Sequence, residues 1–232
     1  MRTLLLLTCA CAWAQVEIPK TGEMLDSAGN LRPVYGLAGS FTVGPPEASG
    51  VLTAACGDQL CLAKTESSLL AGGVAVDAPP GPALIAVDRD EAILYFPRTR
   101  QFARWRAGAL EFVDLTVDGQ VLALRTSSAV IAIAVRRDAN TWIITGLGSV
   151  LDSLPSATGP LLLRHDQVLY ARGDTLVLRR ADASELEFDL PDLETLTAIA
   201  AEWVAARTSR ATYLLRTAPG REQIFVLPEA AP

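Results

Sequence analysis

Residues 83–113 read ALIAVDRDEAILYFPRTRQFARWRAGALEFV and contain four short apolar runs separated by polar turns. Each run is rich in Ile, Leu, Val and aromatic side chains and has the length of an ordinary β-strand. Charged residues, a proline and an Ala-Gly pair lie between the runs, where chain reversals are expected. The stretch therefore predicts one antiparallel sheet of four consecutive strands, at 83–87, 92–96, 102–106 and 109–113.

The same grouping recurs on both sides of this stretch. Similar sets begin at Val51, Val121, Leu161 and Leu196. Their runs are 51–55, 59–63, 68–70 and 74–77; 121–125, 130–136, 141–145 and 149–154; 161–164, 168–172, 175–179 and 186–190; 196–200, 203–207, 212–216 and 223–227. Four strands in each unit of about 40 residues is the pattern of a β-propeller blade. We therefore expect an all-β propeller of about five four-stranded blades; the alternative is a generic β-sandwich.

The chain before the first unit contains one further strand-like run, at 33–43. Such a strand can pair with the last blade and close the ring, which removes an exposed sheet edge. Residues 15–32 are polar and are expected to form an N-terminal tail. The sequence thus predicts a single propeller domain over 33–230.

The first residues have the organisation of a secretory signal. Met1-Arg2-Thr3 is a short positive region, an apolar stretch follows, and Ala12-Trp13-Ala14 fits a small-x-small cleavage site. We expect a signal peptide at 1–14, cleavage near Ala14 and export to the periplasm or the extracellular space. The composition is rich in hydrophobic residues, which make up 50% of the chain, and the mean hydropathy is +0.28. Yet no later apolar run approaches the roughly 20 residues of a membrane span, so none is expected.

Removal of the signal peptide leaves two cysteines, Cys56 and Cys61, on either side of a Gly-Asp turn. In an exported protein this spacing suggests a disulfide across one hairpin, although two buried thiols are the alternative. The chain has a single histidine, His165, and we predict no metal site and no cofactor. Nucleotide-binding glycine motifs are also absent. The net charge of −6 gives no support to nucleic-acid binding.

Cations recur where the second strand of each unit ends. In a propeller these ends share one face, so the cations are expected to form a ring that holds an anionic ligand or an acidic partner surface. The alternative is a set of solvated strand ends, each paired with a nearby carboxylate. The residues of this predicted cation set are Lys64, Arg98, Arg136, Arg172 and Arg207.

Carboxylates gather at the opposite turns and raise the question of catalysis. A glycosidase needs two carboxyl groups about 5 to 10 Å apart across a cleft, but solvated aspartates are also common in turns. His165 beside Asp166 is interpreted as a surface turn residue, because no nucleophile motif accompanies it. We predict no catalytic residue. The turn acids are Asp58, Asp88, Asp90, Glu91, Asp166 and Glu202.

The repeat over about residues 33–228 resembles small secreted bacterial β-propellers, in the broad WD40/YVTN-like class. The likeness is architectural, because the Trp-Asp, Gly-His and Tyr-Val-Thr-Asn signatures are missing. Propellers host many functions, so the resemblance implies no functional residue. Together with the lack of a catalytic motif, it favours a secreted, non-catalytic binding or interaction module. A protein or an anionic glycan would be its partner. The alternative function is a propeller-fold glycoside hydrolase or lyase acting on polysaccharide.

Overall fold

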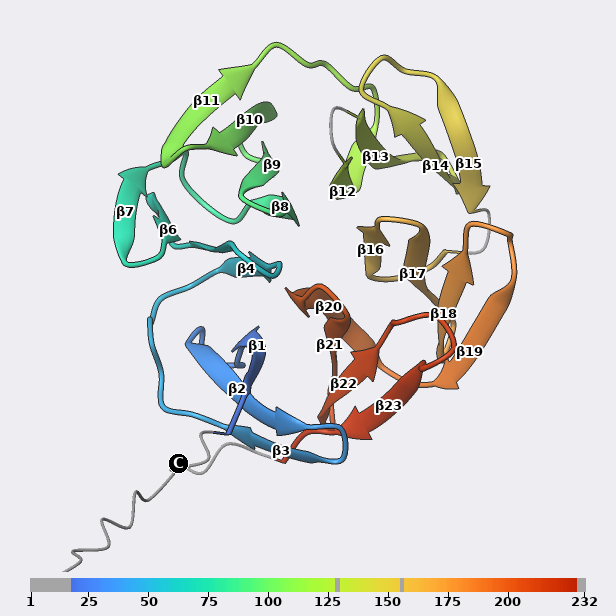
Figure 1. The fold of residues 1–232 in the computed structure, drawn as a ribbon. Helices are drawn as coiled ribbons and strands as arrows, with labels where there is room; N and C mark the ends of the chain where they lie inside the picture. Colours follow the sequence, from blue (N-terminus) through green and yellow to red (C-terminus); the bar gives the residue numbers. More distant parts are fainter. Residues whose placement is uncertain (1–17, 128–129, 155–156, 229–232) are drawn as a thin grey trace, which may run out of the picture.

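The protein forms a ring of six antiparallel sheets, a β-propeller, in a computed structural model that describes residues 18–127, 130–154 and 157–228 (Figure 1). The predicted signal peptide at 1–14 lies outside the described residues. Within those residues no helix is long and apolar enough to cross a membrane.

The blades follow one another along the chain, and each blade is numbered here in chain order. Blade 1 has three strands and each of the others has four. Blade 1 comprises β1 (Lys20–Leu25), β2 (Leu31–Leu37) and β3 (Ser40–Val43); blade 2, β4 (Thr53–Cys56), β5 (Cys61–Lys64), β6 (Ser68–Ala71) and β7 (Val74–Asp77); blade 3, β8 (Leu84–Asp88), β9 (Glu91–Phe96), β10 (Gln101–Arg106) and β11 (Ala109–Val113); blade 4, β12 (Gln120–Ser127), β13 (Val130–Arg137), β14 (Asn140–Thr145) and β15 (Val150–Leu154); blade 5, β16 (Leu161–Arg164), β17 (Gln167–Arg172), β18 (Thr175–Arg180) and β19 (Glu185–Asp189); and blade 6, β20 (Leu193–Ala200), β21 (Trp203–Thr208), β22 (Thr212–Arg216) and β23 (Gln223–Val226).

The all-β propeller and its four-stranded blades are confirmed, but the predicted number of about five blades is wrong. The five groups of runs in the sequence correspond to blades 2 to 6. The sixth blade is built from the chain before them, and part of the stretch expected as a polar tail is the strand β1. That strand escapes sequence analysis because five of its six residues, in KTGEML, are exposed or half-buried.

Blade 1 lacks an innermost strand. Glu23, in β1, lies against Cys56 at the end of β4, whereas the oxygen of Gly29, beyond β1, accepts a hydrogen bond from Val51 before β4 begins. β1 therefore runs opposite to β4, which is the innermost strand of blade 2. This polarity assigns β1, β2 and β3 the places of the second, third and fourth strands of an ordinary blade.

The central channel is consequently lined by five strands. In Figure 1, β1 lies farther from the centre of the ring than β4 and β20 do. The strands β4 and β20 contact each other on the side of β1 that faces the channel. The channel wall is formed by β4, β8, β12, β16 and β20.

The ring is not closed in the predicted way. The run at 33–43 does not pair with the last blade, because β2 and β3 pair within blade 1 and blade 6 provides all four of its own strands. Packing closes the ring instead. Met24, Val34 and Phe41 of blade 1 form one apolar cluster with residues of blade 6, among them Ile199 and Leu214.

The short apolar runs show little polar alternation because both faces of a blade are buried. Along β9, Ala92, Leu94 and Phe96 pack toward blade 2, whereas Ile93 and Tyr95 pack toward blade 4. Successive side chains therefore enter two different cores. Neither face is left for polar residues, which explains the continuous apolar pattern of the sequence.

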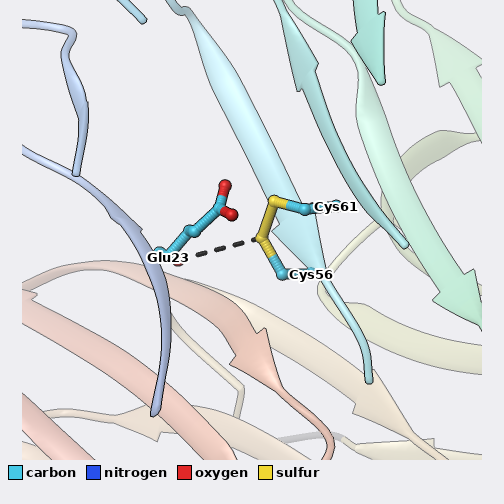
Figure 2. Close-up of side chains that lie close together, drawn as sticks. All are labelled: Glu23, Cys56 and Cys61. Carbon is cyan, nitrogen blue, oxygen red and sulfur yellow. Dashed lines mark hydrogen bonds between the residues drawn. A yellow bond between two sulfur atoms is a disulfide. The ribbon is translucent and has the colours of Figure 1, made fainter. Parts of the chain in front are cut away.

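The disulfide between Cys56 and Cys61 is confirmed. The two residues are direct partners in the β4–β5 ladder, with their Cα atoms 4.0 Å apart. Figure 2 shows the bond beside Glu23 of blade 1, whose backbone oxygen lies 3.9 Å from the sulfur of Cys56. The disulfide thus fastens the hairpin that faces the three-stranded blade.

Replacing both cysteines by alanine is expected to lower the free energy of unfolding by about 2 kcal/mol at most, because the closed loop is short. Chemical denaturation with and without a phosphine reductant measures this effect. Reductant should destabilise the natural protein and leave the Cys56→Ala/Cys61→Ala variant unchanged. A loss of stability well above that value would mean that the disulfide also holds blade 1 in place.

Candidate functional site

One mouth of the central channel carries a cluster of charged side chains. The five inner strands end at this face, and a cavity of about 340 Å³ lies between their ends. The adjoining part of the channel, about 220 Å³, is lined mainly by Leu, Ala and Thr residues. We call the charged end the charged mouth and define it by Asp58, Asp88, Arg89, Arg125, Arg164 and His165.

Arg164, the last residue of β16, fixes the neighbouring hairpin of blade 6. Its guanidinium donates to the backbone oxygens of Ala200 at 2.9 Å and Trp203 at 3.2 Å, and also to that of Ala201. Burial lowers the pKa of Arg164 to about 10, although Asp58 oppositely favours its charged form. The group remains charged at neutral pH, so its hydrogen bonds are the charge-assisted kind.

The same arrangement is repeated one blade earlier. Arg125 of β12 donates to the backbone oxygens of Arg164, at 3.1 Å, and His165, at 2.5 Å. On the other side of blade 6, the amide of Ala201 donates to Asp58 of blade 2 at 3.3 Å. These bonds form what we call the polar belt (Arg125, Arg164, Ala201, Asp58). The polar belt joins blades 4, 5, 6 and 2 and does not include blade 1.

His165 and Asp88 face each other across the charged mouth, with the imidazole Nε2 3.7 Å from a carboxylate oxygen. The histidine side chain is 72% exposed and the aspartate 17%. The predicted surface position of His165 is therefore consistent with its exposure, but the residue also borders the central cavity.

Three members of the predicted cation set are paired with carboxylates. Arg98 lies 2.8 Å from Glu66 of blade 2, and Arg172 contacts both Glu185 and Glu187 within blade 5. Arg207 lies 3.4 Å from a carboxylate oxygen of Glu194.

The other two members bond to backbone oxygens. Lys64 is fully buried, and its ammonium donates to the oxygens of Thr65 at 2.7 Å and Glu66 at 3.1 Å. Burial lowers the pKa of this amine. Arg136 reaches the oxygen of Ala157 at 3.5 Å. Each predicted cation therefore has an acceptor close by, and Lys64 presents no surface to a ligand.

The two arginines of the polar belt were not among the site residues predicted from the sequence. Each lies at or near the end of the first strand of its blade: Arg164 ends β16, and Arg125 lies two residues before the end of β12. The signal was therefore a cation at the end of an inner strand. Its importance depends on how close the next blade comes, which no local pattern reveals.

A second group of donor atoms lies between blades 1 and 2. One ligand atom from each of Glu23, Cys56 and Cys61 lies within 4.8 Å of the other two. Figure 2 shows the three side chains close together. In this structure the two sulfurs are bonded to each other. The disulfide form offers no thiolate to a metal, because only the thiolate is an effective ligand.

No protein-family model and no curated protein matches the sequence. Among solved structures, the chain is similar to PorZ, a surface component of the type-IX secretion system of Porphyromonas gingivalis, with 13% identity and a TM-score of 0.54. That match covers 90% of this chain and 31% of the PorZ chain. It is also similar to a chain of a nidogen/laminin complex, with 11% identity, a TM-score of 0.60, and coverage of 87% of this chain and 91% of that chain. These similarities show a β-propeller fold, and the WD40/YVTN-like resemblance stays a prediction.

Proposed function

We propose that this protein is an exported, non-catalytic binding propeller that holds an anionic glycan or an acidic protein segment at the charged mouth. One observation carries the proposal. Four blades, 2 to 5, bring charged side chains to a single cavity that blade 6 borders with alanines, and the polar belt holds the hairpins that surround it. Binding sites typically combine a preformed hollow with a few fixed polar groups.

Two observations support export. Disulfides persist in oxidising compartments and are rare in the cytosol, and Cys56 and Cys61 are bonded here. PorZ, to which the chain is similar in fold, is described as a bacterial surface component. The signal peptide at 1–14 with cleavage near Ala14 is part of the proposal, and the mass of the mature protein after expression in a bacterial host tests it.

The charged mouth is preferred over the predicted cation set because its exposed Arg89 and His165 border one shared cavity, whereas Arg98, which is also exposed, is paired with Glu66. Arg89 is exposed, and the His165 side chain is 72% exposed. The cations at the second-strand ends already lie against carboxylate or backbone oxygens, although Nε of Arg207 makes no hydrogen bond within the described part of the chain. A ligand binding there would have to displace those partners.

Charge reversal on the two faces separates these sites. With immobilised heparin and polygalacturonate as probes, Arg89→Glu/His165→Glu is expected to weaken binding about tenfold, since charge-assisted contacts are lost. The matched variant Arg98→Glu/Arg136→Glu/Arg172→Glu should bind as the natural protein does, provided that its melting temperature is preserved. The opposite pattern would move the site to the cation set. Unchanged binding in both variants would mean that neither the charged mouth nor the cation set binds the probe, and no binding by the natural protein would exclude these anionic glycans as ligands.

The alternative function is a glycoside hydrolase or lyase, and one observation favours it. Asp58 and Asp88 both line the charged mouth, as a pair of catalytic carboxyl groups would. Release of reducing or unsaturated sugar ends from a polysaccharide panel is the measurement. The binding proposal expects none. Release that is abolished by both Asp58→Asn and Asp88→Asn would replace it with the enzyme.

A further inference from the structure

Blade 2 is the shortest blade of the ring, and a groove crosses it. All four of its strands have four residues, whereas those of blade 3 have five or six. Above its hairpins lies a cavity of about 800 Å³ that extends from blade 1 to blade 3. We call this cavity the acidic trough. Its floor is formed by the turns of blade 2, including Leu60, Gly72 and Gly73, and by Leu70.

Both walls of the acidic trough carry negative charge. Glu23 and Glu47 come from the blade 1 side, and Asp90 comes from blade 3. None of the described residues that line the trough is a lysine or an arginine. Lys20 offsets one of the two negative charges on the blade 1 wall. The negative charge that remains favours a cationic occupant, because opposite charges meet in most specific protein contacts.

A lysine of the chain itself shows how the wall of blade 1 accepts a cation. The ammonium of Lys20 lies 2.7 Å from Glu23 and 3.2 Å from Glu47, and so joins two carboxylates that are far apart in the sequence. Lys20 is 39% exposed in its side chain. Across the trough, Asp90 is exposed on the wall of blade 3.

The floor between these walls is apolar and partly open. Leu60 and Leu70 are half-buried at the turns and strands of blade 2. Val74, which follows Gly73 at the rim, is 59% exposed on the outermost strand β7. An occupant that covers this floor must therefore present apolar side chains as well as cations.

We infer that the acidic trough is a docking surface for an extended segment of a partner protein in which basic and apolar side chains alternate. In an extended chain, successive side chains point to opposite sides. One set would then cover the floor at Leu60, Leu70 and Val74. The other set would leave the floor, and its long, flexible basic side chains would bend at the rims toward the carboxylates of the two walls. The volume lies within the range of sites that take drug-sized ligands. This surface is separate from the charged mouth and goes beyond the function proposed above.

Fluorescence anisotropy of the intact protein with a labelled ten-residue peptide of alternating Leu and Lys tests the inference. The variant Glu47→Gln/Asp90→Asn should weaken binding about fivefold, because two partly exposed ion pairs are lost. The matched control Glu111→Gln/Asp114→Asn removes two exposed carboxylates on and just after the outer strand β11 of blade 3 and should leave the affinity unchanged. A peptide of alternating Leu and Glu should not bind, and higher salt should weaken the Leu/Lys peptide.

Three results would overturn the inference. These are equal affinity of the natural protein and the Glu47→Gln/Asp90→Asn variant, equal binding of the Leu/Glu peptide, and no binding of the Leu/Lys peptide up to about 1 mM. Circular dichroism of each variant establishes that the fold is kept. Both substituted residues are exposed, so unfolding is not the expected cause of any loss.

Discussion

Replacing Arg164 by methionine is expected to lower the free energy of unfolding by about 3 kcal/mol. The guanidinium donates to three backbone oxygens of the blade 6 hairpin, on Ala200, Ala201 and Trp203. Methionine fills much of the same space but cannot donate, and an unpaired buried acceptor costs about 1 to 3 kcal/mol. Water at the exposed rim of the charged mouth satisfies some of these oxygens, so the cost summed over the three acceptors is expected near its minimum of about 1 kcal/mol for each acceptor.

Urea denaturation and thermal melting measure this loss. For a chain of this size, the predicted change corresponds to a fall in melting temperature of roughly 6 to 12 °C. Arg210→Met is the matched control, because Arg210 is exposed in the turn after β21 and should change stability by less than about 0.5 kcal/mol. Equal stability of the two variants would mean that the polar belt does not hold the ring closed.

The prediction of four-stranded blades succeeded because its signal is local. In blade 3 every expected strand lies within one residue of the observed one, from 83–87 against Leu84–Asp88 to Ala109–Val113. Short apolar runs with polar turns are enough to define such a sheet. The prediction missed blade 1 because β1 gives no such local signal. β1 has one buried residue, Met24, and its strand character depends on pairing with Leu31–Leu37 and on contact with Ile199, which is distant in the chain.

The candidate site was predictable in composition but not in arrangement. Asp58 and Asp88 could be assigned to turns of one face, and the structure places both at the charged mouth. What Arg125 and Arg164 contact depends on the spacing of adjacent blades, which arises from packing of whole sheets. The burial of Lys64 likewise follows from the fold of the loop at Thr65 and Glu66, whose oxygens receive its ammonium.

Substituting Gly22 by alanine is expected to destabilise the protein by about 3 kcal/mol, the upper part of the range for overpacking. β1 approaches β20 so closely at this position that a Cβ would overlap the backbone oxygen of Ile199 and lie 2.8 Å from its carbonyl carbon. Backbone atoms cannot turn aside as a flexible side chain can. Blade 1 must therefore move away from blade 6, and the apolar cluster around Met24 and Phe41 opens.

Gly146→Ala is the matched control, since its nearest neighbour for an added Cβ is a side-chain atom of Ile131 at 3.6 Å, an ordinary contact. We expect that variant to stay within about 0.5 kcal/mol of the natural protein in urea denaturation. Because ladder bonds between blade 1 and blade 6 are absent among the described residues, the Gly22→Ala variant should also be cut faster by protease in the segment before β4. Faster cleavage there with little change in global unfolding would show that blade 1 can detach by itself. The ring of five inner strands would then remain closed through the contact between β4 and β20. Unchanged cleavage and stability would mean that β1 does not pack against Ile199 in solution.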